Sequence, residues 1–275
     1  MPTRIITPPV AYPLHLCDVK QHLREDLTEN DGLIEVYFAS AVESAFAITG
    51  RQLVAARFQK VFDCLPCQLE LDVAPLIQVV GVQYLDTNNQ WQTVPATDYV
   101  VEASFKPRIT HTLGIQWPTP QSQIGSVQVT FDAGYVAFAE FDSAANSIKL
   151  HNWKSLQVGD AVRLRNSGGA LPQPLKPQTT YYVQSIVSAD TYTLAATAGG
   201  AVITLLDNGA GWHYAGQIGA AGTDGEIPKG IISYLLIETE TMYSYRGGLI
   251  NTPASTLNEN PRRKHMLDQF RLNYL

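Results

Sequence analysis

The feature that most constrains the fold of this sequence is a stretch of closely spaced turns between residues 141 and 219. Turn-forming pairs such as Gly159-Asp160 and Asn208-Gly209 separate short runs that are rich in β-branched and aromatic residues. Many short strands with turn signals at this spacing are typical of a small all-β module. We therefore predict a barrel- or sandwich-like unit here. Its predicted strands cover residues 148–150, 161–164, 180–183, 192–194 and 202–205.

Helical patterns precede this stretch. Apolar residues at three- and four-residue steps predict one helix over residues 16–27 and a second over residues 31–49. Asn30 and Asp31 are suitable N-terminal caps for the second helix. Gly50 readily adopts the left-handed conformation in which helices commonly end. Before these helices, four prolines within residues 2–13 indicate an extended arm.

Between the second helix and residue 135 the hydrophobic period changes from helical to two. Residues 58–62, 80–84 and 127–131 alternate between the two faces of a strand, and the polar run 86–89 predicts a turn. These segments predict a small antiparallel sheet. Shorter strand candidates lie at residues 91–94, 99–101 and 108–110.

Helical periodicity returns after residue 219. Pro228 suits the first turn of a helix over residues 229–245. Its apolar stripe and that of helix 31–49 need a partner, so we expect the two helices to pack together. A polar linker leads to a last short helix over residues 262–272, with Met266, Leu267 and Phe270 on one side.

The predicted fold class is therefore α+β: a helical core domain with a small antiparallel β-sheet, plus an inserted all-β barrel- or sandwich-like module. The core domain is assigned residues 1–140 and 220–275, and the inserted small β domain residues 141–219. Insertion of a compact module at an exposed loop is tolerated because its two ends usually lie close together.

The composition favours some classes of function and argues against others. Charged residues make up 16% of the chain, against about 25% in typical domains. A surface so poor in charge suits a protein that is covered by neighbours in an assembly. The net charge of -6 argues against a broad basic face that grips nucleic acid. No apolar run approaches the ~20 residues of a membrane span, and no secretory signal is visible, so a cytoplasmic location is expected.

Motifs for catalysis or metal binding are not found. Cys64 and Cys67 have C-x-x-C spacing, but a zinc site needs two further ligands, and Cys17 stands alone. Thiols at a turn are the better interpretation. No nucleophile elbow, phosphate-binding loop or dinucleotide fingerprint occurs. We therefore predict no enzyme activity, no catalytic, cofactor-binding or metal-binding residue, and no cofactor.

Several short motifs occur in order along the flanks of the β-rich stretch. They are residues 18–24 (DVKQHLR), 49–51 (TGR), 62–63 (FD) before 65–66 (LP), 82–86 (VQYLD) and 127–135 (VQVTFDAGY). Together they resemble the head–tail connector (adaptor) proteins of tailed bacteriophages, over residues 13–135 and 228–272. Pro228, Tyr243, Tyr245 and Arg246 fit the helix that follows the AGY strand in that family. The β-rich stretch is extra, and His15 stands where the family usually has a Ser or Thr cap.

The resemblance implies a structural protein of the virion neck, present in the host cytoplasm during assembly. Such connectors form a homo-oligomeric ring, commonly of twelve subunits, under the portal protein. The ring extends the DNA channel and provides the docking surface for the stopper or tail-terminator protein. DNA passes through the lumen without sequence-specific binding, and no membrane is involved. An acidic or neutral lumen suits a channel through which DNA slides.

The basic run Arg262-Arg263-Lys264 admits two interpretations: a solvated helix end or a contact with an acidic partner surface. We expect the C-terminal segment to dock onto the portal, with folding back onto its own domain as the alternative. The residues assigned to portal docking are Arg262, Arg263, Lys264, Met266, Leu267 and Phe270.

Two other functions remain open on the sequence. The first is a tail-associated receptor- or carbohydrate-binding structural protein, in which aromatic residues of the β module stack on sugars. The candidates are Trp153, Tyr181, Tyr182 and Trp212. The second is a hydrolase with an accessory β module, which no motif supports.

Overall fold

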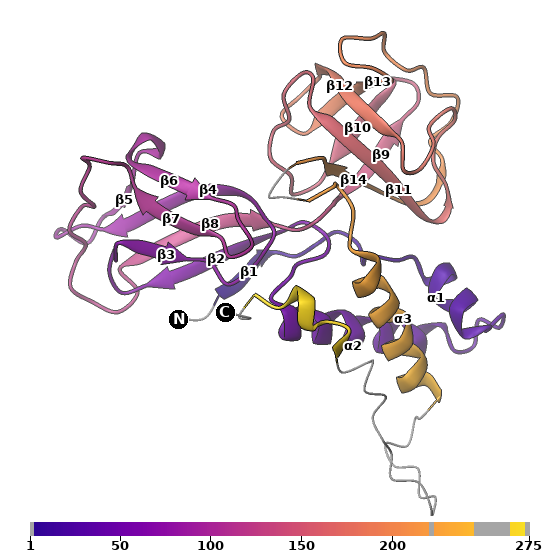
Figure 1. Ribbon diagram of the computed structural model, residues 1–275, viewed down its shortest axis with the longest axis horizontal. Coiled ribbons are helices and arrows are strands. Elements are labelled where there is room, and N and C mark those ends of the chain that lie inside the picture. Colours follow the sequence, from indigo (N-terminus) through magenta and orange to yellow (C-terminus); the bar gives the residue numbers. More distant parts are fainter. Residues whose placement is uncertain (1–2, 220–222, 245–264, 273–275) are drawn as a thin grey trace, which may run out of the picture.

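The computed structural model describes residues 3–219, 223–244 and 265–272. Figure 1 shows three parts: a lobe of two sheets, a closed barrel, and a group of helices beneath them. The fold is α+β with an all-β barrel module, as predicted from the sequence.

The first helix is shorter than its apolar periodicity predicts. Helix α1 (Leu16–Leu23) ends because Arg24 adopts the left-handed conformation, with φ 56°. Leu27 was expected on the buried face, but it lies beyond the helix with 61% of its surface exposed. The backbone turn at Arg24 therefore overrides the side-chain pattern.

Helices α2 (Asp31–Thr49) and α3 (Lys229–Ser244) form the helical core together with α1. Leu235 of α3 lies in the same buried cluster as Ile34, Phe38 and Ala41 of α2. The predicted packing of the two helices is confirmed, although the whole barrel separates them along the chain. Gly50 ends α2 with φ 68°, as predicted.

Helix α2 is also long and apolar enough to cross a membrane by length and composition, with a mean hydropathy of 1.3. Glu35 and Glu43 interrupt the helix, so no uninterrupted apolar run marks it in the sequence. One side of α2 is buried in the helical core, whereas Val36 on the outer side is 59% exposed. The helix therefore carries apolar side chains outside the face that packs in the core.

The sheet lobe contains two antiparallel sheets that enclose one core. The larger has the order β1-β2-β8-β4-β5, and the smaller has the order β3-β7-β6. Phe58 and Phe131 of the first sheet pack with Leu69 and Ile109 of the second. The strands are β1 (Thr3–Thr7), β2 (Ala56–Phe62), β3 (Gln68–Glu70), β4 (Leu76–Leu85), β5 (Trp91–Thr93), β6 (Tyr99–Glu102), β7 (Arg108–His111) and β8 (Val127–Ala133), with a 3-10 turn η1 (Ala96–Asp98) before β6.

The N-terminal arm was expected to be merely extended, but its first part is the edge strand β1. It pairs antiparallel with β2 and places Ile5 opposite Phe58. On the other face of the sheet, a row of hydrogen-bonded side chains crosses all five strands. This row runs from Arg4 through Gln59 (2.9 Å), Gln128 (2.9 Å) and Gln83 (2.8 Å) to Thr93 (3.4 Å).

Six antiparallel strands close the barrel in the order β10-β13-β12-β11-β14-β9. Residues 202–205 do not form the predicted strand and make only an isolated bridge from Val202 to Ala195. The barrel also begins at Ala137, before the predicted boundary at residue 141, and neither its first nor its last strand was predicted. The strands are β9 (Ala137–Asp142), β10 (Ser147–Leu150), β11 (Ala161–Ala170), β12 (Thr180–Ile186), β13 (Thr191–Ala195) and β14 (Ala210–Gln217).

Candidate interaction surfaces

The barrel is joined to the helices through the first turn of α1. The Asp18 carboxylate accepts hydrogen bonds from the Ser167 hydroxyl and, at 3.1 Å, from the Gly168 amide. The His15 amide donates to the Ser167 hydroxyl oxygen at 2.8 Å, and the His15 ring meets Trp212 edge-on at 4.9 Å. Residue 15 therefore acts both as the N-cap of α1, through Nδ1, and as a contact to the barrel.

Most aromatic residues proposed for sugar stacking serve the protein's own packing. Tyr181 is buried in the barrel core, and its hydroxyl oxygen accepts a hydrogen bond from the Lys176 amide at 2.8 Å. Trp153 packs against the same core, whereas Trp212 packs against the helical core. Only Tyr182 of the four is in neither cluster.

The C-terminal segment packs on its own domain. Leu267 is 1% exposed within the helical core, and Met266 and Phe270 pack against that core. Arg51 donates from Nε to the carbonyl of Phe270 at 2.8 Å. The sequence predicted a helix over residues 262–272, but the described part holds a 3-10 turn, η3 (Asp268–Phe270), followed by extended Arg271.

This arrangement is the fold-back alternative for the apolar residues of the segment. Arg262, Arg263 and Lys264 lie outside the described residues. These contacts give no information about a portal, so docking of the whole segment onto a portal stays a prediction.

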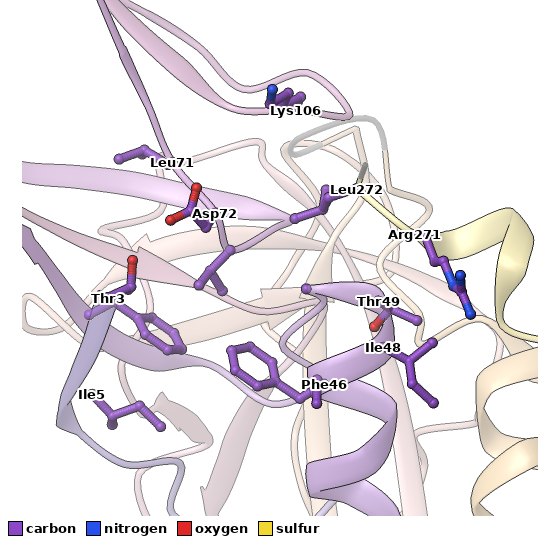
Figure 2. Close-up of a pocket in the computed structure, with 14 residues that line it drawn as sticks. Thr3, Ile5, Phe46, Ile48, Thr49, Leu71, Asp72, Lys106, Arg271 and Leu272 are labelled. Carbon is purple, nitrogen blue, oxygen red and sulfur yellow. The ribbon is translucent and has the colours of Figure 1, made fainter. Parts of the chain in front are cut away.

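A groove of about 820 Å³ lies between the end of α2, strand β1 and the C-terminal segment. Figure 2 shows Ile5, Phe46 and Ile48 beside it, with Leu272 on the opposite wall. Thr3 of β1 also lines the groove, and its hydroxyl is buried without a hydrogen-bond partner among the described residues. No sequence motif marked this groove, because its walls come from six separate parts of the chain.

The charged residues that line the groove are already paired. Asp72 lies 2.6 Å from Lys60, and Lys106 lies 2.8 Å from Glu70. Arg271 lies 3.2 Å from Asp268 of the same turn. The groove therefore offers apolar walls whose neighbouring charges are neutralised within the protein.

A second groove of about 590 Å³ shares Ile5 and Phe46 with the first and runs along residues 8–13 of the arm. Apolar side chains beside it are well exposed, including Val10 at 53% and Tyr12 at 44%. The two grooves make a long apolar surface along the arm and α2. Exposed apolar patches of this kind are typical of surfaces that contact a partner.

Within residues 3–219, 223–244 and 265–272 no cluster of three or more His, Cys, Asp or Glu side chains could hold a metal ion. Cys17, Cys64 and Cys67 are free and exposed. The two grooves are therefore the candidate sites in the part of the chain that the structure describes.

No protein-family model matches the sequence, and no curated protein matches it. Solved structures do share its fold. A chain of the virion of the native gene transfer agent (GTA) particle is 14% identical, with a TM-score of 0.54 over 98% of this chain and 95% of that chain. With the same coverage, a chain of the neck of the empty GTA particle, computed with C6 symmetry, is 12% identical, with a TM-score of 0.55.

A chain of the neck of the native GTA particle, computed with C12 symmetry, is also 12% identical, with a TM-score of 0.51. At such identities the similarity establishes the fold. The protein therefore has the fold of chains found in the neck of a phage-like particle. The similarity extends over 98% of the chain, so it includes the barrel as well as the helices and the sheet lobe.

Proposed function

We propose that this protein is a structural component of a virion neck, a ring-forming head–tail adaptor that sits under the portal. The ring, of twelve subunits, extends the DNA channel and presents the docking surface for a stopper or tail-terminator protein. The observation that carries the proposal is the near full-length fold similarity to neck chains of GTA particles. The protein has no catalytic role in this proposal.

The surface properties support an assembly role. A closed ring uses a head-to-tail interface in which two different patches of each subunit meet. The long apolar surface along the arm and α2 is a suitable patch, because its apolar side chains are exposed in the isolated chain. The net charge of -6 suits a channel wall that DNA passes without being held.

The test is the assembly state of the purified full chain, measured by native mass spectrometry and electron microscopy, alone and with its portal. We expect closed rings, or rings that form on the portal. A protein that stays monomeric under both conditions contradicts the proposal. A small oligomer that binds glycans would favour the alternative of a carbohydrate-binding tail protein.

We further propose that the C-terminal segment carries the portal contact. The apolar residues Met266, Leu267 and Phe270 hold the segment on the helical core, and this anchoring leaves Arg262, Arg263 and Lys264 as the part that contacts an acidic surface of the portal. Replacing these three basic residues with Ser is the sharper test, because truncation at residue 258 also removes Leu267 from the core. We expect a folded protein with reduced attachment to portal-bearing capsids.

A matched control replaces three exposed basic residues that line neither groove, Arg108, Lys149 and Lys176, with Ser. Attachment that is equally strong in the triple variant and in the control contradicts the portal contact.

A further inference from the structure

The loop between β7 and β8 is unusual in length, composition and exposure. Residues 112–126, here called the neutral loop, contain no Asp, Glu, Lys or Arg. Leu113 is 98% exposed and Ile124 is 85% exposed, the highest values among the exposed large apolar residues of the described chain. Long loops without secondary structure in a compact domain are usually functional.

The neutral loop is held firmly at both ends and in its middle. The Thr112 hydroxyl donates to the carbonyl of Thr97 at 2.9 Å, and the Ser126 hydroxyl donates to the carbonyl of Asp63 at 2.8 Å. Trp117 packs against the core of the sheet lobe. Leu113 and Ile124 are therefore presented on an anchored loop, which lowers the entropy lost on binding.

The 820 Å³ groove suits an occupant of this chemistry. Its walls are apolar at Ile5, Phe46 and Ile48, and the charges beside it are paired within the protein. A charged occupant would lose hydration without gaining a free partner there, whereas an uncharged aliphatic one loses little. No residue of the neutral loop lines the groove of its own chain.

We propose that the neutral loop of one copy docks in the 820 Å³ groove of the neighbouring copy. The proposal rests on the proposed ring and identifies two of its meeting surfaces. Because the loop and the groove are different patches of one chain, each copy can give a loop and receive one. This is the head-to-tail arrangement that a closed ring requires.

A cysteine cross-link tests the contact directly. In a background in which exposed Cys17, Cys64 and Cys67 are replaced with Ser, one sample carries Ile124→Cys and another carries Ile48→Cys. We expect a disulfide-linked dimer when the two samples are mixed and oxidised, and no such product from either sample alone. The matched control mixes Ile48→Cys with Val158→Cys, an exposed barrel position.

Yield from the Ile124–Ile48 mixture that does not exceed the control overturns the docking proposal. Dimers from Ile124→Cys alone would show a symmetric contact and overturn it as well. The ring proposal is judged separately by the mass of the wild-type protein. A wild-type ring without the cross-link therefore refutes the docking and leaves the ring, whereas a wild-type protein that is monomeric both alone and with portal refutes the ring.

A second measurement uses substitutions at highly exposed positions, where we expect the fold to be kept. Leu113→Ser with Ile124→Ser should raise the concentration needed for half-assembly by about tenfold or more. Leu206→Ser, at a 71% exposed position of the barrel, should leave it unchanged. Unaltered assembly of the double variant, with an unaltered circular dichroism spectrum, contradicts the proposal.

Discussion

At the scale of single residues, the most demanding environment belongs to Asp132 in the sheet lobe. Its side chain is fully buried and accepts hydrogen bonds from Arg57 at 2.7 and 3.0 Å and from Gln78 at 2.7 Å. The carboxylate raises the pKa of Arg57 mainly through this hydrogen bond. A charge without water contact is tolerated only with such a complete set of partners.

We expect Asp132→Ala to lower the free energy of unfolding by ~2–4 kcal/mol, because Arg57 and Gln78 lose their acceptor. Chemical denaturation measures this change. Glu102→Ala, which breaks an exposed pair with Arg108 on the other sheet, should have a much smaller effect. If both substitutions lowered the free energy of unfolding equally, burial would not explain the contribution of Asp132.

His213 makes the barrel sensitive to pH. It is 6% exposed, and burial lowers the pKa of its imidazole below the ordinary value of 6.5. The unfolded chain therefore takes up a proton first as the pH falls, so stability is present above pH 6.5 and declines below it. We expect the melting temperature to fall between pH 7 and 5.5, and to fall less in His213→Gln. Identical pH profiles would refute this assignment.

At the scale of elements, the joint between α1 and the barrel depends on a glycine. Gly168 has φ 76°, and a Cβ there would lie 2.4 Å from the His15 ring. Gly168→Ala should therefore destabilise the protein by ~2 kcal/mol or more, combining backbone strain with the displacement of His15. Thermal unfolding measures the change.

The control for this joint is Gly159→Ala. Gly159 also has a positive φ, 92°, but a Cβ there would meet no atom within 4 Å. This substitution should cost only the backbone strain of ~1 kcal/mol. A Gly168 variant no less stable than the Gly159 variant would contradict the close contact.

The barrel as an element is expected to be dispensable for folding of the rest. Its removal has a cost, since Tyr214 is fully buried in the helical core and its hydroxyl donates to the carbonyl of Tyr12. Deleting residues 137–217 should give a soluble protein that unfolds cooperatively but with a melting temperature about 10 °C or more lower. Calorimetry on several join lengths tests this, and unfolded product from all of them would make the barrel part of one indivisible core.

At the scale of the whole molecule, low charge and apolar grooves predict how assembly responds to salt. Salt does not screen contacts between uncharged surfaces, whereas it weakens the attraction between a basic run and an acidic partner surface. We expect ring formation to persist when salt is raised from 0.1 to about 1 M, and attachment to portal-bearing capsids to weaken. Light scattering measures ring formation, and sedimentation measures attachment to the capsids. Loss of rings at high salt would point to an electrostatic subunit interface.

Local sequence patterns determined much of this architecture. The bounds of α2, the period-two strands of the sheet lobe and the turns of the barrel depend on neighbouring residues, since glycine conformations and alternation are properties of short segments. These features were therefore predictable. The capping expected of Asn30 is not found, because its side chain makes no cap hydrogen bond. The packing of Leu235 against Ile34 and Phe38 was also predictable, because two apolar stripes require each other.

Tertiary structure alone decided the rest. The pairing of β1 with β2, the strand β14 and the return of Leu267 to the helical core depend on surfaces that are far apart in sequence. The groove is the clearest case, since residues near both ends of the chain meet there. Burial of apolar surface has no direction along the chain, so the partner of such a segment is chosen by shape and proximity in the folded state.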